Sequence, residues 1–546
     1  TCALPIYRGR ERNRNHRLLL RSLPRLRPEL ILGGNYMRPQ KLRILLPLSL
    51  MTVSLLSGCG GNRVNPYTVD FSLDISGAKV NFWGPFGADN NAIVEDLIAV
   101  FEEQTGVDVV YESKGSYDQL KQAIDLSATS QTYPHLTLGY PDHFAGYVRS
   151  NIIVRLDYYF ESGGTYAYGD YNEADRTYAM TDFYEDYMVE NQSIEMKSET
   201  EGWTLGVPFN KSTEIMTINK TFFDWAVTQN PEITVPATWD EVAAVGPKIT
   251  TLLQPFFGKV IGSDGLAYAN AQAAADAGQT VVLDMTNASA NLFRPLSYDS
   301  QANLFITTVR QNGGTYTEID YTSGKGYLAY NSEETVEGLQ RLRDLFDDKV
   351  LGVPKLWEES KYSSGPFKDV MAVMAIGSTA GVQNNAPAGN KFTLSAAPIP
   401  YVDASRKYVI SQGTNLALLD RGTEQERVAA WRLLQFLSKY ANAEFVQRSG
   451  YFPSCEYAEN DPDYQDFLAN PGFSTTEKIK AEVAKVNSNV YIDDDENWIK
   501  FVDAPFVGSA YVRNEVAAIP EALFFTEETI QQILDNSYAN MPEYVR

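Results

Sequence analysis

Two hydrophobic periods alternate along the chain from residue 78 onward. Short apolar runs at 78–83, 107–111 and 135–139 are typical of buried strands. Between them, apolar residues recur at every third or fourth position, which is the spacing of one helical face. Strands that alternate with helices predict βαβ units and a parallel sheet, so the predicted fold class is α/β.

A second block of the same kind follows a stretch with strong turn signals. Gly206, Pro208 and Asn210 are turn formers, so we expect the chain to bend or cross there. Residues 214–218 then predict a buried strand, and a helix follows it. The chain is therefore predicted to leave one α/β block and enter another near residue 212.

In later segments, some helices and strands are clearly predicted by the sequence and others are not. Thr238 and Thr423 are each followed three residues on by Glu, the capping box that begins a helix. The apolar run 370–376 predicts another buried strand. In contrast, residues 157–205 are rich in Tyr and acidic residues and poorly periodic, which predicts surface loops and short helices.

The segment that begins at Met37 has the features of a secretory signal. Basic residues precede an apolar run at 44–56 that is too short to span a membrane. The tetrapeptide Leu56-Ser-Gly-Cys59 follows and resembles a lipobox, in which the Cys becomes lipidated. We expect a signal peptide at 37–58 and a tether at 59–77; an ordinary signal peptide with an incidental Cys is the alternative.

Residues 1–36 do not fit this scheme. They are rich in Arg, lack a packing pattern and precede a complete signal peptide. Residues 1–6 resemble the translation of a sequencing adapter. We therefore expect residues 1–36 to be a non-native extension and the precursor to start at Met37.

Length and charge restrict the classes of protein to which the chain can belong. At 546 residues the chain is too long for one ordinary domain, so two lobes are expected. Residues 1–58 carry a net charge of +9, and the remaining 35 basic and 67 acidic residues carry −32. So acidic a body lacks the basic surface that nucleic acid requires, and we predict no nucleic-acid partner.

Metal and catalytic motifs are scarce. The three cysteines (Cys2, Cys59 and Cys455) show no paired framework, and the three histidines do not form a zinc pattern, so we predict no metal and no cofactor. Residues 377–381 do not have the G-x-S-x-G order, and no phosphate-binding Gly loop occurs. The acidic turn at 493–496 lacks the spacing of a calcium loop. The sequence therefore predicts no enzyme, although the many carboxylates would permit a glycan-cleaving one.

Three motifs resemble one family. Pro208-Phe-Asn-Lys-Ser-Thr213 followed by a strand, Pro236-Ala-Thr-Trp-Asp-Glu241, and Gly450-Tyr-Phe-Pro453 are similar to stretches of the extracellular solute-binding proteins of ABC importers. The sugar-binding and glycerol-3-phosphate-binding members are the most similar, and the resemblance covers 78–546. It implies a two-lobed periplasmic-binding-protein fold with three interlobe crossings and a central ligand cleft.

The resemblance also implies the domain organisation. One lobe would comprise 78–211 and 415–452, and the other would comprise 212–414 and 453–546. The chain would cross between them near residue 212, at 411–415 and at 450–453, which makes each lobe discontinuous in sequence.

Candidate ligand-binding residues lie in predicted cleft loops and crossings. Ligands of open α/β sheets bind at the carboxyl ends of strands, and sugar rings are recognised by aromatic faces together with planar polar groups. These rules and the resemblance give the candidates Trp83, Tyr117, Tyr140, Asp142, Asn210, Tyr298, Gly377, Ser378, Gln412, Asn415 and Tyr451. Core packing is the alternative role for Trp83 and Tyr451, and turn formation is the alternative for Asn210, Gly377 and Ser378.

The function implied is that of a surface lipoprotein. It would capture a carbohydrate by hinge closure and deliver it to the transmembrane subunits of an ABC permease, as a monomer held at the membrane by Cys59. The glycerol-3-phosphate branch has a late Arg for phosphate, whereas 502–508 offers none here and Arg513 lies beyond it. This favours neutral carbohydrate. Glycerol-3-phosphate or another small polar solute, a secreted glycan-active enzyme, and a sensory or adhesive surface protein remain alternatives.

Overall fold

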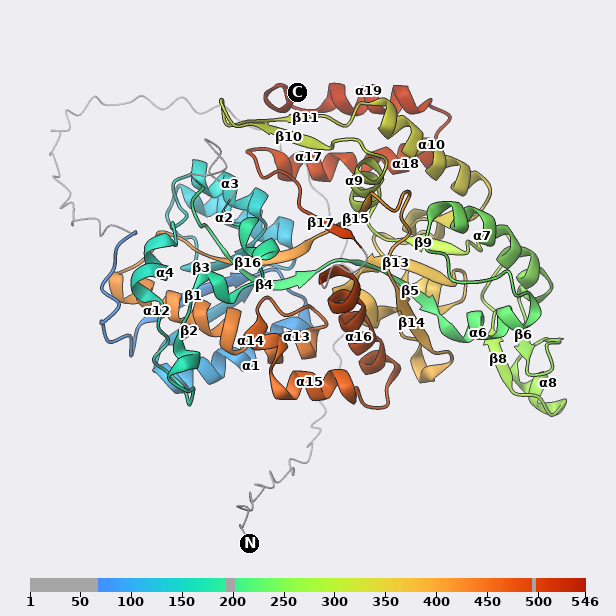
Figure 1. Cartoon of the computed structure of the whole chain (residues 1–546), viewed down its shortest axis with the longest axis horizontal. Coiled ribbons are helices and arrows are strands. Elements are labelled where there is room, and N and C mark those ends of the chain that lie inside the picture. The colour runs from blue at the N-terminus through green and yellow to red at the C-terminus, as the bar shows by residue number, and fades with distance from the viewer. Residues whose placement is uncertain (1–66, 193–201, 493–496) are drawn as a thin grey trace, which may run out of the picture. The chain divides into compact units, whose positions relative to one another are not determined.

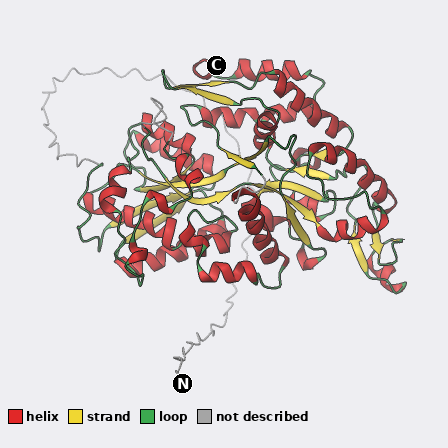
Figure 2. Cartoon of the chain, viewed as in Figure 1, coloured by secondary structure: helices red, strands yellow, loops and turns green. Residues whose placement is uncertain are grey.

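The computed structural model describes residues 67–192, 202–492 and 497–546, and its strands form two five-stranded sheets with smaller sheets beside them (Figure 1). Helices flank the strands of both large sheets (Figure 2). The predicted extension, the signal peptide, residues 59–66 of the predicted tether (with Cys59) and the acidic turn at 493–496 lie outside the described residues.

The first sheet has the order β2-β1-β3-β16-β4. β1, β2 and β3 are parallel, and β16 runs antiparallel to both β3 and β4. The carboxyl ends of β1, β3 and β4 therefore share one edge of the sheet with the amino end of β16. The strands are β1 (Lys79–Gly84), β2 (Asp108–Ser113), β3 (Leu136–Gly139), β4 (Val207–Ser212) and β16 (Gln412–Leu418).

The second sheet has the order β12-β9-β13-β5-β14. β12, β9 and β13 are parallel, and β5 is antiparallel to its neighbours β13 and β14. The amino end of β5 thus lies beside the carboxyl ends of β9 and β13. The strands are β5 (Glu214–Asn219), β9 (Leu296–Tyr298), β12 (Leu351–Gly352), β13 (Met374–Ser378) and β14 (Leu394–Ala397).

Three chain segments lie together at the junction of the two sheets and hydrogen-bond to one another. Only Thr213 separates β4 of the first sheet from β5 of the second (Figure 1). At the start of β16, Gln412 pairs in register with Ser212. The amide of Phe452 donates to the carbonyl of Lys211 over 2.8 Å. The three segments predicted as crossings therefore lie side by side, and the first two lead from one sheet to the other.

Each sheet and the helices that pack on it form a body with its own hydrophobic core. We call these two bodies the first lobe and the second lobe. The first core contains Phe82, Leu138 and Trp431, and the second contains Met216 and Ile376. The helices that bury residues in the first core are α1 (Ala88–Thr105), α2 (Tyr117–Ala128), α3 (Pro141–Arg149), α4 (Asp157–Gly163), α5 (Glu185–Val189), α12 (Glu424–Gln435), α13 (Asn442–Ser449), α14 (Glu456–Glu459) and α15 (Pro462–Ala469).

A second set of helices covers the second core. They are α6 (Lys220–Gln229), α7 (Trp239–Leu253), α9 (Gln301–Gln311), α10 (Glu333–Asp347), α11 (Ser364–Lys368), α16 (Thr475–Val486), α17 (Ser509–Val516), α18 (Ala518–Phe525) and α19 (Ile530–Asn540). Beyond the third crossing, Cys455 and Tyr464 pack in the first core and Ile479 in the second. The exact domain bounds remain a prediction.

Smaller elements complete the second lobe. One three-stranded sheet lies beside α8 (Ala271–Asp276), and two further pairs of strands form a hairpin and a parallel ladder. Their strands are β6 (Val260–Gly262), β7 (Ala267–Tyr268), β8 (Val281–Asp284), β10 (Thr317–Asp320), β11 (Lys325–Leu328), β15 (Lys407–Ile410) and β17 (Trp498–Phe501).

Both predicted capping boxes are confirmed. The hydroxyl of Thr238 accepts the amide of Glu241 over 3.1 Å, and the Glu241 carboxylate accepts the amide of Thr238. Thr423 and Glu426 form the same pair at the start of α12. Each box satisfies amides at a helix start that the helix itself leaves without a partner.

Two local predictions were wrong in part. The chain crosses near residue 212 as predicted, but Pro208 and Asn210 do not turn it, because they lie within the buried strand β4. β4 is the edge strand of its sheet, where the missing amide of Pro is tolerated. The predicted strand at 370–376 begins only at Met374, since Val370 has a φ of 56° that no strand allows.

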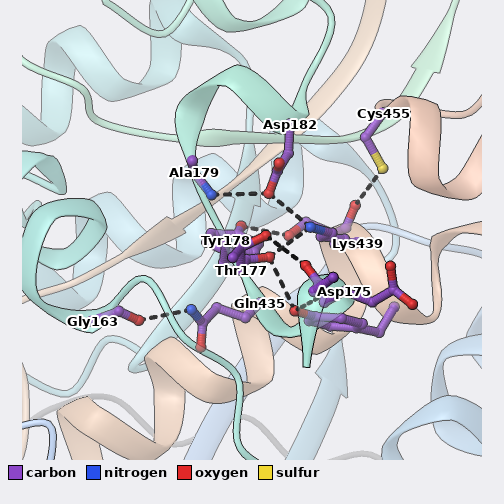
Figure 3. A network of polar contacts seen from close by, with 12 residues as sticks. Gly163, Asp175, Thr177, Tyr178, Ala179, Asp182, Gln435, Lys439 and Cys455 are labelled. Carbon is purple, nitrogen blue, oxygen red and sulfur yellow. Dashed lines mark hydrogen bonds and ion pairs between the residues drawn. The ribbon is translucent and has the colours of Figure 1, made fainter. Parts of the chain in front are cut away.

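The Tyr-rich segment 157–205 contains the predicted short helices, but its described part, 157–192 and 202–205, is not confined to the surface. Tyr166 and Tyr178 are fully buried in the first core, although the segment has few regular elements. Figure 3 shows how polar contacts hold it against α12 and the π-helical turn that follows. The ammonium of Lys439, itself buried, donates to the Thr177 carbonyl over 2.6 Å and to Asp182 over 2.8 Å. Because this order depends on contacts more than 250 residues away in sequence, periodicity did not reveal it.

Within the ranges that the structure describes, none of the helices is both long and apolar enough to cross a membrane. The same residues contain no group of three or more His, Cys, Asp or Glu side chains placed to hold a metal ion.

Candidate functional site

A cluster of tyrosines lies where the carboxyl ends of the first-lobe strands meet the crossings. The hydroxyls of Tyr117 and Tyr451 are 3.4 Å apart, and the Asn210 amide nitrogen donates to the Tyr117 hydroxyl over 3.0 Å. Thr414 in turn donates to Asn210 Oδ1 over 2.5 Å. The ring of Tyr140 packs against that of Tyr117 with centroids 5.0 Å apart. Four predicted site residues are therefore in one contiguous group, which we call the tyrosine cluster.

Local structure explains each position in the cluster. Ser116 caps α2, and this places Tyr117 at the first position of the helix. Tyr140 follows β3 directly and precedes Pro141, which begins α3. Gly450 ends α13 with a φ of 87°, a conformation that favours glycine, and thereby directs Tyr451 toward the crossings.

The cluster presents neutral hydroxyls and aromatic faces. Burial raises the pKa of Tyr117, Tyr140 and Tyr451, so all three phenols stay protonated at any physiological pH. Each side chain is only half-buried overall. Such rings can cover the apolar face of a sugar, and their hydroxyls can donate or accept hydrogen bonds.

The second lobe faces the cleft with a chain of buried polar groups. The hydroxyl of Tyr298 donates to the Glu214 carboxylate, and the Asn303 amide nitrogen donates to the same carboxylate over 2.9 Å. The guanidinium of Arg513 donates to Asn303 Oδ1 and pairs with Asp503. This polar chain runs from the first crossing, at the start of β5, to α17.

Burial dominates the electrostatics of the polar chain. It raises the pKa of Glu214 to about 7, because desolvation outweighs the hydrogen bonds from Tyr298 and Asn303. Burial likewise raises the pKa of Asp503, although Arg513 opposes the shift. Burial alone would lower the pKa of Arg513, but the neighbouring Asp503 and the other acids raise it. Arg513 is therefore always charged, and its charge is balanced within the second lobe.

The two lobes meet at α3 and α17. The charge of Asp142, at the start of α3, acts on both Arg513 and Asp503. The side chain of Asn514 on α17 donates to Asp118 of the first lobe over 3.3 Å. The tyrosine cluster and the polar chain thus face each other across the junction between the lobes.

A buried ion pair lies beside the crossings. The ammonium of Lys211, the penultimate residue of β4, pairs with Glu190 and lies over the ring of Tyr187 at 5.1 Å. Both charges are almost fully buried. Burial lowers the pKa of Lys211, and the nearby Glu190 opposes that shift. The pair links α5 to the first crossing.

Similarity to known proteins identifies the class. The model of bacterial extracellular solute-binding proteins matches residues 96–473, which is more than half of the chain. The chain belongs to this family. No curated protein is similar to the sequence at a significant level.

Solved structures of similar fold include several solute-binding proteins. UgpB from Mycobacterium tuberculosis, in complex with glycerophosphocholine, has a TM-score of 0.60 and 17% identity over 85% of this chain and 97% of its own. The cyclic alpha-maltosyl-1,6-maltose binding protein from Arthrobacter globiformis has a TM-score of 0.57 and 17% identity over 85% and 98%. A substrate-binding protein from Listeria monocytogenes, in complex with cycloalternan, has 0.59 and 15% over 85% and 98%. These likenesses confirm the two-lobed periplasmic-binding-protein fold.

The remaining predicted site residues of this solute-binding protein lie in other settings. Trp83, at the end of β1, lies under the Lys114 ammonium, 3.8 Å from the ring. Asn415 is buried in β16 and accepts a hydrogen bond from Asn191 over 2.9 Å. Gln412, in the second crossing, is half-buried. Their contact with a ligand remains a prediction.

The predicted site residues of the second lobe also lie in different settings. Tyr298 is fully buried and reaches the site through Glu214. Gly377 and Ser378 end β13 beside the amino end of β5, and the next amide, that of Thr379, donates to the Thr213 carbonyl over 2.9 Å. That amide is therefore used by the crossing and not by a ligand.

Several residues of the site were missed by sequence reasoning. Glu214 lies inside the run read as an apolar strand, where a lone carboxylate among buried positions was the available signal. Arg513 was placed beyond the relevant segment, whereas the structure brings it to Asn303 and Asp503. No local pattern in the sequence joins residues 200 positions apart, so Asn303 could not be recognised as their partner.

Proposed function

We propose that this protein captures a carbohydrate between its two lobes and delivers it to the membrane subunits of an ABC permease. The observation that carries the proposal is the tyrosine cluster at the crossings, opposite the polar chain of the second lobe. Aromatic faces, neutral hydroxyls and balanced charges are the groups that bind an uncharged polyhydroxyl ring. Closure of the lobes around such a ring would be stabilised by contacts from both sides.

We further propose that the protein acts as a binding protein and not as an enzyme, as a monomer at the cell surface. The sequence supports anchoring through a lipid on Cys59. Growth with a radioactive fatty acid should label the wild-type protein and leave Cys59→Ser unlabelled. Equal labelling of both forms would contradict the anchor.

A thermal-shift screen of the purified protein tests the ligand class. Saturation at 100 to 1,000 times Kd stabilises a protein by about 3–4 kcal/mol, which raises the melting temperature by several degrees. We expect a shift with one class of sugar and no consumption of that sugar. Turnover of the sugar would instead support a glycan-active enzyme.

Two variants locate the binding. Tyr117→Ala removes a ring of the tyrosine cluster and should weaken sugar binding at least tenfold. Tyr268→Ala removes a half-buried ring of the small β6–β8 sheet and should not weaken it. Equal loss in both variants would contradict this location.

A phosphorylated polyol is the second candidate ligand. The placement of Arg513 at the lobe junction favours it, and the fold neighbour UgpB is in complex with a phosphodiester. The pairing of Arg513 with Asp503 opposes it, because the guanidinium charge is already balanced. Glycerol-3-phosphate and glycerophosphocholine therefore belong in the screen, and a shift with either would replace the carbohydrate assignment.

A further inference from the structure

One carboxylate at the strand ends of the second lobe is not a member of the polar chain. Asp299 directly follows β9, whose neighbour β13 ends at the same edge of the sheet, beside the start of β5. The first crossing leads into β5, so this edge lies at the junction of the lobes. Ligands of open α/β sheets bind at the carboxyl ends of strands. Asp299 therefore stands where a ligand-binding residue is expected, although the sequence did not single it out.

The contacts within the described residues use only one oxygen of Asp299. The amide of Ser363 donates to Oδ1 over 2.8 Å, and the buried Ser363 hydroxyl donates to the same oxygen. The other oxygen, Oδ2, has no hydrogen-bond partner in this part of the chain. Asp299 is only half-buried, and Oδ2 is not one of the enclosed polar atoms that lack a partner. Oδ2 is therefore open to solvent, and a ligand can reach it.

Gly377 leaves room for this free oxygen. A Cβ on Gly377 would lie 2.7 Å from Asp299 Oδ2 and 3.4 Å from Cγ, so one of the two residues would have to move. Gly377 does not have the left-handed φ that favours glycine. The absence of a side chain at this strand end therefore serves the position of the Asp299 carboxylate.

The loop that holds Asp299 lies near the tyrosine cluster of the first lobe. Tyr362 directly precedes Ser363, and its side chain is 57% exposed. Burial is the main cause that raises the pKa of Tyr451, and the nearby phenol of Tyr362 adds to the shift. On its other side, Asp299 is close enough to the polar chain for its charge to act on Glu214. The carboxylate thus lies between the two halves of the candidate site.

A carboxylate oxygen in this position has a defined chemistry. It can only accept hydrogen bonds, and bonds to an ionised acceptor are about twice as strong as those between neutral groups. A site that is built to bond one hydroxyl rejects an analogue that lacks it, because the polar group of the site is then left without its partner. The bonds from Ser363 to Oδ1 already hold the loop, so Oδ2 is available for recognition.

We propose that Asp299 selects the sugar, by accepting a hydrogen bond at Oδ2 from one particular hydroxyl of the ring. Ser363 and Gly377 are positioning residues, because both act through the Asp299 carboxylate. The inference rests on the proposed function and names the residue that distinguishes one sugar from another.

Isothermal titration with glucose, galactose, mannose and maltose, and with the monodeoxy derivatives of the sugar that binds, tests the proposal. In the wild type, loss of one particular hydroxyl should weaken binding at least tenfold, as expected for a bond to a charged acceptor. In Asp299→Asn, the donors of Ser363 should hold the carbonyl oxygen, so the amide nitrogen, which only donates, replaces Oδ2. This variant should bind the parent sugar at least tenfold more weakly and lose less than about threefold further with the same deoxy derivative.

Gly377→Ala tests the position of the carboxylate without removing it. The added methyl group crowds Oδ2 and should weaken binding of the parent sugar roughly 3- to 10-fold. Asp403→Asn is the matched control. Asp403 Oδ1 likewise accepts the amide and the hydroxyl of Ser405, over 2.7 and 2.6 Å, but Asp403 is exposed. This control should bind every sugar like the wild type.

The outcomes separate this inference from the proposed function. Unchanged affinity in Asp299→Asn, or the same loss with the deoxy derivative in this variant as in the wild type, would overturn the role of Asp299 while sugar binding stands. If Asp299→Asn does not fold, unchanged affinity in Gly377→Ala would overturn it instead. Failure of all four sugars to bind the wild type would overturn the two together.

Discussion

Replacing Glu214 by glutamine should stabilise the protein more strongly at alkaline than at acidic pH. Glu214 is fully buried, and its pKa is raised from 4.5 to about 7 by desolvation. The folded protein therefore holds the proton more tightly than the unfolded chain. The stability that this provides is complete below pH 4.5 and is lost as the pH rises through 7.

The magnitude follows from the two pKa values. The difference between 4.5 and about 7 corresponds to about 3 kcal/mol of folding free energy once Glu214 is ionised in both states. Between pH 5 and pH 8.5 the wild type should lose about 2.5 kcal/mol of this stability. Glutamine resembles the protonated carboxyl in shape and can keep the bonds to Tyr298 and Asn303. Glu214→Gln should lack this loss.

Urea unfolding at pH 5 and pH 8.5 measures the effect. The stability gain of Glu214→Gln over the wild type should be about 2.5 kcal/mol larger at pH 8.5 than at pH 5. Glu318→Gln is the matched control, because Glu318 also accepts a tyrosine hydroxyl but is exposed. The reasoning is refuted if both variants show the same pH dependence, or if Glu214→Gln is less stable than the wild type at pH 8.5.

Two further predictions concern other buried charges. Burial lowers the pKa of His135 to about 4, so the wild type should lose about 3 kcal/mol of folding free energy as the pH falls from 6.5 through 4. His135→Asn keeps an acceptor for the Asn81 amide and should not show this loss; parallel acid-unfolding curves for the two proteins would contradict the prediction. Lys439→Met leaves the Asp182 carboxylate without its cation and should lower the free energy of unfolding by about 3 kcal/mol, measured with urea. Lys220→Met removes the cation of an exposed pair and should cost less than about 1 kcal/mol; similar losses in the two variants would contradict a larger contribution from the buried pair.

The sequence predicted those parts of the fold that depend on neighbouring residues. The capping boxes at Thr238 and Thr423 were recognised because each requires only a few adjacent side chains. The strand from Glu214 was found because its run of buried residues is local. The resemblance of short motifs to one family then supplied the three crossings, which no period could reveal.

The candidate site was predicted mainly in its first-lobe half, and Tyr298 was the one predicted member of the polar chain. Tyr117 lies at a predicted helix start and Tyr140 directly follows a predicted strand. Both were therefore identified by the rule that ligands bind at the carboxyl ends of strands in open α/β sheets. Arg513 reaches the site from a helix near the end of the chain, and its partner Asn303 comes from α9. Their meeting is a product of tertiary packing, and the sequence offers no local sign of it.

Small-angle X-ray scattering of the purified protein with and without its bound sugar tests the central claim most directly. If the sugar is held between the lobes, contacts from the tyrosine cluster and from the second lobe should favour the closed arrangement. The account predicts that the radius of gyration decreases at saturating sugar in the wild type, and that Tyr117→Ala requires at least tenfold more sugar for the same decrease. An unchanged radius of gyration in the wild type, at a sugar concentration shown by titration to saturate it, would contradict capture by closure of the lobes.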